Sequence, residues 1–581
     1  MAMLGIDVGG TFTDAVLLAD GRLRTAKVPT SARQEESVVA AAAVVGATNL
    51  ERFTHGTTVA TNALLERKGA RTAFVGTAGF EHLLHLRRQT RAHLYRLCLD
   101  HPEPLVPLER CYGVRERIGP GGVLEELDLA SLERFNAEAV AVCLLFSFRD
   151  PAHERRVADE LRRRLPGARV VASHEVSPEF REYERASTTT VDAYLGPVVA
   201  RYLGALAGAC RAVGLPEPLV MRSSGGVATV AEAAAHPAWA LVSGPAAGAV
   251  GAAEIARRAG LERAISFDMG GTSTDVSLVA AGEAERAGER AVAGFPLRLP
   301  TVDLHTVGAG GGSIAWHDAG GALRVGPESA GADPGPACYG RGGTRPTVTD
   351  ANLLLGRLPE RLAGGVELDR GAADRALAGM DPAAVIEAVN AEMLRALRVI
   401  SVERGHDPRE LGLVAFGGAG PLHACALAEE LGIDTVLVPA VAGVLSALGL
   451  VASDERRDRV TSYVRPLAEI EESELPAQGE ADLRYVGQSF ELTVPLGADL
   501  AETFHRAHAE GYGYADRGRA VELVAVRTAE VRPGPGLELP PGEPLEVSGP
   551  DVVALEGATC WIPRGWVGVR DGDSTLILTR A

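Results

Sequence analysis

The sequence contains 581 residues, of which 46% are hydrophobic and 23% are charged, and its formal net charge at pH 7 is −18. This length and this apolar content allow several domains with buried cores. The negative charge, with no basic stripe to offset it, disfavours nucleic acid or an anionic membrane surface as a partner.

The cysteine and lysine contents, and the absence of a long apolar run, limit the kinds of site and the cellular location that we expect. Seven cysteines are scattered without a Cys-x-x-Cys pair, which disfavours a disulfide framework and a thiolate zinc site and favours a reducing cytoplasm. Met1 precedes the first predicted strand almost directly, and no apolar run is long enough to span a bilayer, so we expect a soluble, cytoplasmic protein. Lys27 and Lys68 are the only lysines among 58 basic residues, so a lysine nucleophile has almost nowhere to sit.

Two copies of one motif, Asp-x-Gly-Gly-Thr-x-Thr-Asp, organise the chain. They span residues 7–14 and 268–275, and an apolar run precedes each copy. The pattern predicts a strand that enters a tight turn, where backbone N–H groups can approach a phosphate and Asp7 or Asp268 can hold hydrated Mg²⁺. One such turn could simply reverse the chain, but two copies 261 residues apart are hard to explain by packing. The phosphate-binding residues that we predict are Gly9, Gly10, Thr11, Thr13, Gly270, Gly271, Thr272 and Thr274.

The first third of the chain reads as an α/β segment. Residues 4–28 predict strands joined by turns, with a hairpin at Gly21, and residues 35–47 predict a buried helix. Residues 140–147 are apolar throughout, which is typical of a strand in a parallel sheet that is covered on both faces. Residues 151–165 predict a surface helix.

Polar side chains in the same segment are candidate substrate contacts. His55 and Thr57 precede a predicted helix that contains Asn62. His55 could act as a general acid or base or donate to a substrate, although a lone histidine before a helix is more often a capping or packing group. Arg88 belongs to a basic run at residues 87–91, which could meet a polar substrate or form a solvated face or an interface.

Further along, residues 178–213 predict a helix that is broken at Gly196-Pro197. Asp303 and His305 fall on one side of an extended segment and could bind substrate or ligate a metal, but two ligands do not make a metal site. His505 and His508 are spaced to meet on one helix face, and we interpret them as a packed pair.

The paired motifs resemble the two phosphate loops of the actin, sugar kinase and Hsp70 superfamily, in which duplicated domains close on ATP. More narrowly, the chain resembles the hydantoinase A/5-oxoprolinase family, which includes acetone carboxylase beta-type subunits. The segments that carry this resemblance occur in the family's order and cover nearly the whole chain. They begin at His55, Ser243, Asp268, Gly308, Gly331 and Arg484.

The resemblance implies an α/β fold with two duplicated actin-like ATPase (ribonuclease H-like) halves around a nucleotide cleft, plus a small β-rich C-terminal domain. The corresponding divisions are residues 1–180, 181–465 and 466–581. Small-residue helices at 243–252 and 439–450 would link the halves. The adenosine end of ATP would lie at Gly417, Gly418 and Gly420.

The implied activity is ATP-dependent ring opening of a cyclic amide such as a hydantoin or 5-oxoproline, in which phosphorylation makes the carbonyl oxygen a leaving group. The catalytic residues would be Asp7, Asp268, Thr11, Thr272 and His55, with Asp7 and Asp268 as the metal ligands. The substrate residues would be His55, Thr57, Asn62, Arg88 and His305. A B-type subunit would hydrolyse the activated substrate, in a homodimer or hetero-oligomer.

Three alternatives stay open at this point. The chain could be the ATPase subunit of a ketone carboxylase acting on acetone or acetophenone. It could be a small-molecule kinase of the same superfamily, which would need a base facing the substrate hydroxyl. It could also be a non-catalytic ATP-gated assembly subunit, although no peptide-binding tail of the usual size follows.

Overall fold

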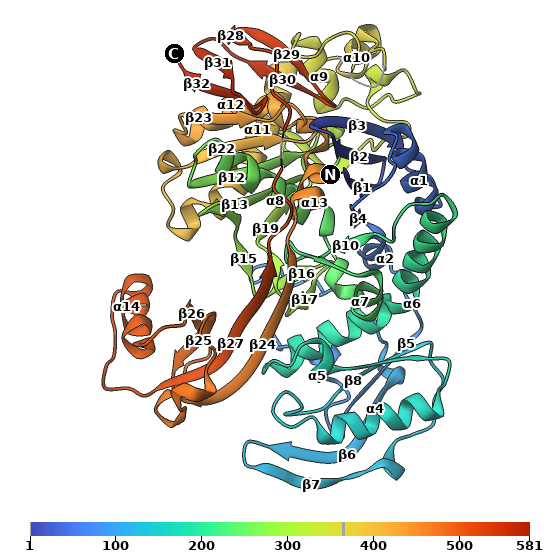
Figure 1. Cartoon of the computed structure of the whole chain (residues 1–581), viewed down its shortest axis with the longest axis vertical. Helices are drawn as coiled ribbons and strands as arrows, with labels where there is room; N and C mark the ends of the chain where they lie inside the picture. Colours follow the sequence, from blue (N-terminus) through green and yellow to red (C-terminus); the bar gives the residue numbers. More distant parts are fainter. Residues whose placement is uncertain (1, 363–365, 538) are drawn as a thin grey trace.

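The computed structural model describes residues 2–362, 366–537 and 539–581, and its architecture is mixed α/β (Figure 1). Two large sheets of ten and nine strands form the body, and a separate five-stranded sheet lies at the opposite end from the chain's C-terminus. Among the described residues, no helix is long and apolar enough to cross a membrane.

The first large sheet contains a five-strand unit in the order β3-β2-β1-β4-β10. The β1–β2 and β2–β3 pairs are antiparallel, whereas β4 runs parallel to both β1 and β10. The predicted strands and hairpin of residues 4–28 are confirmed. The strands are β1 Ala2–Val8, β2 Phe12–Ala19, β3 Arg22–Pro29, β4 Arg52–Thr57 and β10 Leu219–Met221.

The second large sheet repeats this unit in the order β14-β13-β12-β22-β23. Its pairings are again antiparallel, antiparallel, parallel and parallel. The repeat places the ends of β1 and β12, and therefore the two motifs, in equivalent positions. The strands are β12 Arg263–Met269, β13 Thr274–Ala280, β14 Glu283–Ala284, β22 Gly412–Phe416 and β23 Thr435–Val438.

Two small-residue helices, α8 Ser243–Arg258 and α13 Leu445–Ala452, pack against each other between the two units. Their contact is closer than side chains allow, because a Cβ built on Gly449 would lie 1.9 Å from Ala247 O. The helix α13 also lies on β1, where a Cβ on Gly5 would lie 2.1 Å from Ala447 O. Glycine at these positions therefore sets how closely the units approach.

The five-stranded sheet has the order β7-β6-β5-β8-β9 and is inserted after β4 and α2. The predicted buried strand is confirmed as β8, which runs parallel to both β5 and β9, and the predicted surface helix is confirmed as α4. The elements are β5 Thr72–Thr77, β6 Cys111–Gly119, β7 Gly122–Asp128, β8 Ala139–Cys143, α4 Ala152–Arg164 and β9 Arg169–Ala172.

The long helix α6 Glu182–Ala212 follows this insertion and contradicts the predicted break at Gly196-Pro197, because it continues through Pro197. Proline removes only one helical N–H, and most of the helix between residues 184 and 210 is buried. A Cβ on Gly196 would lie 2.1 Å from the Arg169 side chain, so tertiary packing holds this position. Packing therefore overrides the local breaking tendency.

The residues after 466 contribute to both large sheets. The strand β24 ends at this point and forms a long antiparallel pair with β27, and together with β25, β26 and α14 the two strands form an arm beside the body (Figure 1). The strands β28, β31 and β32 instead extend the second large sheet beside β23. The division of the chain at residues 180 and 465 stays a prediction. The elements are β24 Glu455–Pro466, β25 Glu480–Tyr485, β26 Leu492–Pro495, α14 Leu500–Tyr512, β27 Val521–Arg532, β28 Glu546–Ser548, β29 Asp551–Leu555, β30 Ala558–Ile562, β31 Trp566–Arg570 and β32 Leu576–Arg580.

Of the remaining helices and strands, β11 lies between β10 and β24 in the first large sheet, β19 pairs with β13 in the second, and the others cover the sheets or connect their strands. The bounds of all these elements are α1 Gln34–Val44, α2 Val59–Leu65, α3 Leu83–Leu86, α5 Ser173–Val176, β11 Val227–Ala228, α7 Val230–Ala235, β15 Arg286–Ala287, β16 Arg290–Val292, β17 Phe295–Leu297, β18 Thr301–Val302, β19 Leu304–Val307, β20 Ser313–His317, β21 Leu323–Ser329, α9 Val348–Leu354, α10 Arg370–Ala376, α11 Pro382–Ile400 and α12 Gly420–Leu431.

Candidate active site

The two motifs form matching turns at the ends of β1 and β12. Gly9 N donates to Phe12 O at 2.9 Å, and Gly270 N donates to Ser273 O at 3.0 Å. The turn tips, Gly10 and Gly271, are exposed. A Cβ at either tip would meet no other atom within 4 Å, so both backbones are open to a ligand.

The electrostatics of the carboxylates place the two motifs across from each other. Burial, with Asp14 adding repulsion, raises the pKa of Asp7 to about 7. Burial raises the pKa of Asp268 to about 8, with further repulsion from Asp275 and from the first motif's Asp7 and Asp14. Oδ1 of Asp7 is buried and has no hydrogen-bond partner. This donor set fits a hydrated dication, since Mg²⁺ binds proteins through one or two carboxylates and keeps several waters.

Glycines on the neighbouring strands leave room for these carboxylates. A Cβ built on Gly56 would lie 2.5 Å from Asp7 Oδ1, and one built on Gly417 would lie 2.3 Å from Asp268 Oδ1. Gly56 pairs with Asp7 in β4, and Gly417 directly follows β22, so a glycine lies beside the carboxylate in both repeated units.

The predicted adenosine loop lies beside the second motif. Gly417 has a φ of +78°, which favours glycine, and Ala419 N donates to Met269 O at 2.9 Å. The helix α12 begins at Gly420, and Gly418 lies near the turn at Gly557 between β29 and β30. The structure therefore brings Gly417, Gly418 and Gly420 next to Asp268.

The four motif threonines divide into two kinds. Thr13 and Thr274 are buried, with Thr13 Oγ1 3.0 Å from Thr30 Oγ1 and Thr274 Oγ1 donating to Ala309 O at 2.6 Å. These two hydroxyls hold the turns in place. Thr11 is partly buried and Thr272 is exposed, so these hydroxyls remain closer to where a phosphate would enter.

The predicted substrate residues do not form one cluster. His55 is fully buried, with Nδ1 3.1 Å from Ile6 O and Nε2 2.8 Å from Tyr202 Oη, and burial lowers its pKa to about 4. The geometry gives His55 a packing role beneath β1, and its role in catalysis stays an untested prediction. Arg88 instead pairs with Glu184, and the 18 residues of α6 between Glu184 and Tyr202 span about 27 Å.

The other three substrate residues occupy separate surroundings. Thr57 is buried next to Ser243, whose Oγ donates to Thr57 O at 3.0 Å. Asn62 is partly buried on α2 and donates to Thr58 Oγ1. His305 is partly buried on β19, where burial and then the Arg404 charge lower its pKa.

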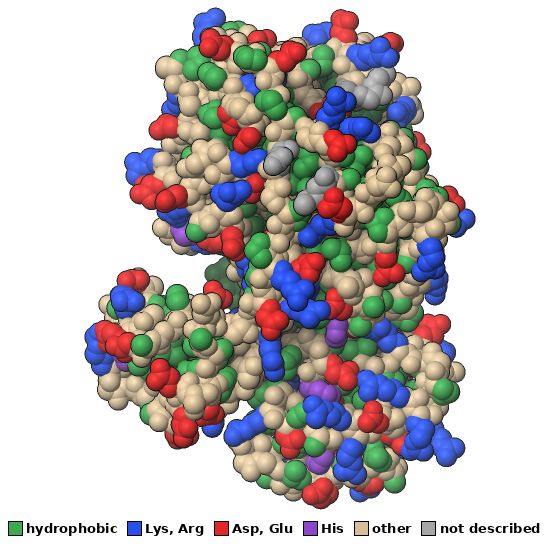
Figure 2. Space-filling view, in the orientation of Figure 1, with side chains coloured by type: hydrophobic (Ala, Val, Ile, Leu, Met, Phe, Trp, Pro, Cys, Tyr) green, Lys and Arg blue, Asp and Glu red, His purple; other side chains and the backbone are tan. Residues whose placement is uncertain are grey.

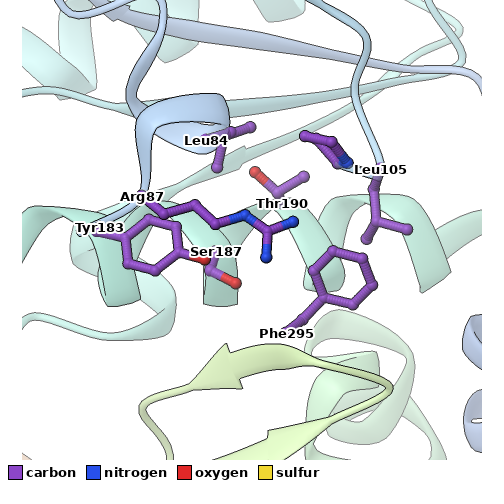
Figure 3. Close-up of a pocket in the computed structure, with 8 residues that line it drawn as sticks. Leu84, Arg87, Leu105, Tyr183, Ser187, Thr190 and Phe295 are labelled. Atoms are coloured by element: carbon purple, nitrogen blue, oxygen red, sulfur yellow. The ribbon is translucent and has the colours of Figure 1, made fainter. Parts of the chain in front are cut away.

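Two cavities lie near the Arg88 end of α6, away from the motifs. The larger has a volume of about 600 Å³, lies between α6 and the arm, and is lined by five arginines and five carboxylates. The smaller, about 10 Å³, holds roughly one water. Figure 3 shows the Arg87 guanidinium pointing into it between Tyr183 and Phe295. Arginines and carboxylates pair around the larger cavity, as in Arg88–Glu184 and Arg181–Glu491.

Sequence reasoning missed Lys27. Its Nζ lies 2.5 Å from Asp14 Oδ1, and its charge partly offsets the burial that raises the pKa values of Asp7, Asp14 and Asp268. The signal was present, because the β2–β3 hairpin around Gly21 pairs Asp14 with Lys27. Asp14 and Asp275, the second carboxylates of the two motifs, also belong to this site.

Within the described ranges, no group of three or more histidine, cysteine, aspartate or glutamate side chains could hold a metal ion. His505 and His508 pack around Tyr485, with Tyr485 Oη 2.8 Å from His505 Nδ1, which confirms the prediction of a packed pair. Asp303 pairs with Arg404. The face of the molecule in Figure 2 interleaves basic and acidic side chains without a single basic surface.

Sequence and structure comparisons place this site in a known family. Residues 3–165 match the hydantoinase/oxoprolinase N-terminal region, and residues 185–459 match the hydantoinase/oxoprolinase family. The chain belongs to the hydantoinase/oxoprolinase family. This confirms the resemblance that the motifs indicated.

Individual relatives give more detail. The caprolactamase subunit alpha of Pseudomonas jessenii is 34% identical, over 97% of this chain and 90% of that protein. The crystal structure of the ATP-dependent caprolactamase from the same organism superposes with a TM-score of 0.87 at 31% identity and covers both chains fully. The acetophenone carboxylase gamma subunit of Aromatoleum aromaticum is 35% identical, over 77% of this chain and 67% of that protein.

Proposed function

We propose that the chain binds ATP with Mg²⁺ between its two repeated units and uses it to activate the carbonyl oxygen of a cyclic amide. The observation that carries this proposal is the pair of matching turns, which face each other with exposed glycine tips and the partnerless Oδ1 of Asp7. The likeness to an ATP-dependent caprolactamase supports the choice of a cyclic amide. The repeated five-strand units support two actin-like halves.

Each part of the site has a role in this proposal. Asp7 and Asp268 hold Mg²⁺ through water, and backbone N–H groups at Gly9, Gly10, Gly270 and Gly271 bind phosphate. Thr11 and Thr272 add hydroxyl donors, and Gly417, Gly418 and Gly420 flank the nucleoside. ATP supplies the phosphoryl group that makes the amide oxygen a leaving group, and the chain's own contribution is positioning and charge neutralisation.

We further propose that a separately encoded B-type subunit completes the hydrolysis, in a cytoplasmic hetero-oligomer or homodimer. The described residues include no three-ligand metal group to activate water. The loop after α3 exposes an apolar segment, with Leu94, Tyr95 and Leu97 at 65%, 86% and 79% exposure. Arg96 lies within this segment and Arg91 lies three residues before it, so a partner groove that is apolar with an acidic rim would fit it.

A ketone carboxylase subunit is the second candidate. The likeness to the acetophenone carboxylase gamma subunit favours it, because activation of a ketone oxygen uses the same ATP site. A small-molecule kinase remains the third reading, and it requires a carboxylate base at a substrate hydroxyl.

The test is ADP release by the purified chain across hydantoins, 5-oxoproline, caprolactam, ketones and sugars, with and without the partner subunit. We expect cyclic amides to stimulate ADP release most, and Asp7→Ala and Asp268→Ala to abolish it while the circular dichroism spectrum is retained. Near-normal ATP-dependent turnover in either variant, or stimulation by sugars alone, would refute the proposal.

A further inference from the structure

Lys27 has no role in the function proposed above, although it lies at the first motif. We propose that Lys27 is a phosphate-contacting residue, whose ammonium group moves from Asp14 to the terminal phosphate of ATP when the nucleotide binds. The inference rests on the proposed function, because it assumes that ATP occupies the cleft.

The position of Lys27 allows this contact. It lies on β3 directly opposite Asp14 on β2, and its Nζ is 2.5 Å from Asp14 Oδ1. Its side chain is 33% exposed, so the ammonium group is open to a ligand. The ammonium group lies over the Phe12 ring, with Nζ 5.4 Å from the ring centroid, and a Cβ built on Gly557 would lie 3.5 Å from Lys27 Cε. Phe12 lies two residues after Gly10, the first motif's turn tip.

The charges around Lys27 support the same contact. Besides its ion pair with Asp14, its positive charge is near enough to act on Asp7 of the first motif and on Asp268 of the second. At the second motif the nearby cation is Arg290, whose charge acts on Asp275 and which donates to Thr306 Oγ1. Incoming phosphates add negative charge to four carboxylates, and Lys27 is positioned to offset it at the first turn.

The choice of side chain fits this role. The chain uses arginine almost everywhere, yet lysine stands at this position. A lysine ammonium is a compact charge with three donors, so it can hold a carboxylate and a phosphate oxygen together, whereas the guanidinium is a planar fork.

The experiment measures the affinities of AMPPNP and of ADP, each with Mg²⁺, by isothermal titration calorimetry on the full chain. We expect Lys27→Gln to weaken AMPPNP binding about tenfold or more and ADP binding much less, because one charge-assisted hydrogen bond to the terminal phosphate is lost. Lys68→Gln is the matched control, since Lys68 is 75% exposed and pairs only with Glu66 among the ion pairs described, and both affinities should be unchanged.

Two further variants separate phosphate binding from a structural ion pair. Asp14→Asn keeps the lysine and should keep the preference for AMPPNP, whereas a structural role predicts that it behaves like Lys27→Gln. The double variant Asp14→Asn/Lys27→Gln leaves neither charge unpaired, so it should fold and still lose the preference. Equal losses for AMPPNP and ADP, or no loss, would overturn the inference while leaving the proposed function intact. A wild-type chain that binds neither nucleotide would overturn the proposed function itself.

Discussion

Asp7 and Asp268 are two residues whose ionisation the fold clearly opposes. An acid whose pKa is raised in the folded state binds more protons there than in the unfolded chain, so stability falls as pH rises between the two pKa values. For Asp7 this window runs from the ordinary value of 3.8 to about 7, and for Asp268 from 3.8 to about 8.

We therefore expect the nucleotide-free protein to lose stability as pH rises toward about 8, with about 2 kcal/mol lost between pH 6 and pH 8 through Asp268. Asp268→Asn should reduce this loss, because the amide does not titrate. Thermal melting followed across this pH range measures the effect. A variant whose pH profile parallels that of the wild type would show that Asp268 is ionised at little cost in the fold.

His55 should behave as a packing residue. His55→Leu removes two hydrogen bonds from a buried site, those to Ile6 O and Tyr202 Oη, and each buried group left unsatisfied costs about 1 to 3 kcal/mol, so the melting temperature should fall. Because the pKa of His55 is lowered to about 4, its protonation should not contribute a limb near pH 6.5 to the turnover profile. If His55→Leu kept the wild-type melting temperature but abolished turnover, the acid-base role would be restored.

The motif residues were predictable because their chemistry is local. A strand, two glycines and flanking hydroxyls specify a tight turn within eight residues, and the structure forms this turn twice. The separation of Arg88 from His55 was not predictable. It depends on the length and course of α6, which are set by the tertiary structure. The role of Lys27 was missed because the scarcity of lysine in the sequence says nothing about where a single lysine lies. The register of β2 and β3, which pairs Lys27 with Asp14, decides its position.

At the scale of elements, the α8–α13 contact connects the two units. Gly449→Ala would place a Cβ 1.9 Å from Ala247 O, so the helices must separate. We expect a loss of about 2 kcal/mol or more in stability together with weaker ATP binding, because the two turns are held through these helices. Differential scanning fluorimetry with and without ATP measures both effects.

The control for this substitution is Gly208→Ala on α6. Gly208 is exposed, and a Cβ there meets no atom within 4 Å, so the change should be neutral or stabilise by about 0.5 to 1 kcal/mol. Equal melting temperatures for Gly449→Ala and Gly208→Ala would mean that α8 and α13 do not set the spacing of the units.

The helix elements also mark where sequence reasoning stops. The small-residue helices were predictable from composition, although α13 begins at Leu445 and not near Pro439. The continuity of α6 was not predictable, because the residues that bury it are distant in sequence. Arg169 packs against Gly196 of α6, and His55 is hydrogen-bonded to Tyr202 of α6. The two sheets that the C-terminal strands join are equally a property of tertiary structure.

At the scale of the whole molecule, we propose that this chain activates the carbonyl group and that a partner completes the hydrolysis. We expect slow ATPase activity from the chain alone and substrate-coupled turnover only with the partner. Replacement of Leu94, Tyr95 and Leu97 by serine should weaken co-purification with that partner while leaving nucleotide binding unchanged. Full ring opening by the single chain, with no partner detected by mass spectrometry, would contradict this division.

The most direct test of carbonyl activation follows the oxygen atom. A cyclic amide that supports ADP release is labelled with ¹⁸O at its carbonyl, and the inorganic phosphate formed in the presence of the partner is analysed by ³¹P NMR. If the amide oxygen accepts the phosphoryl group and water then attacks the carbon, the label must leave with phosphate, so we predict one ¹⁸O per phosphate. Unlabelled phosphate, with ¹⁸O retained in the ring-opened carboxylate, would contradict the account.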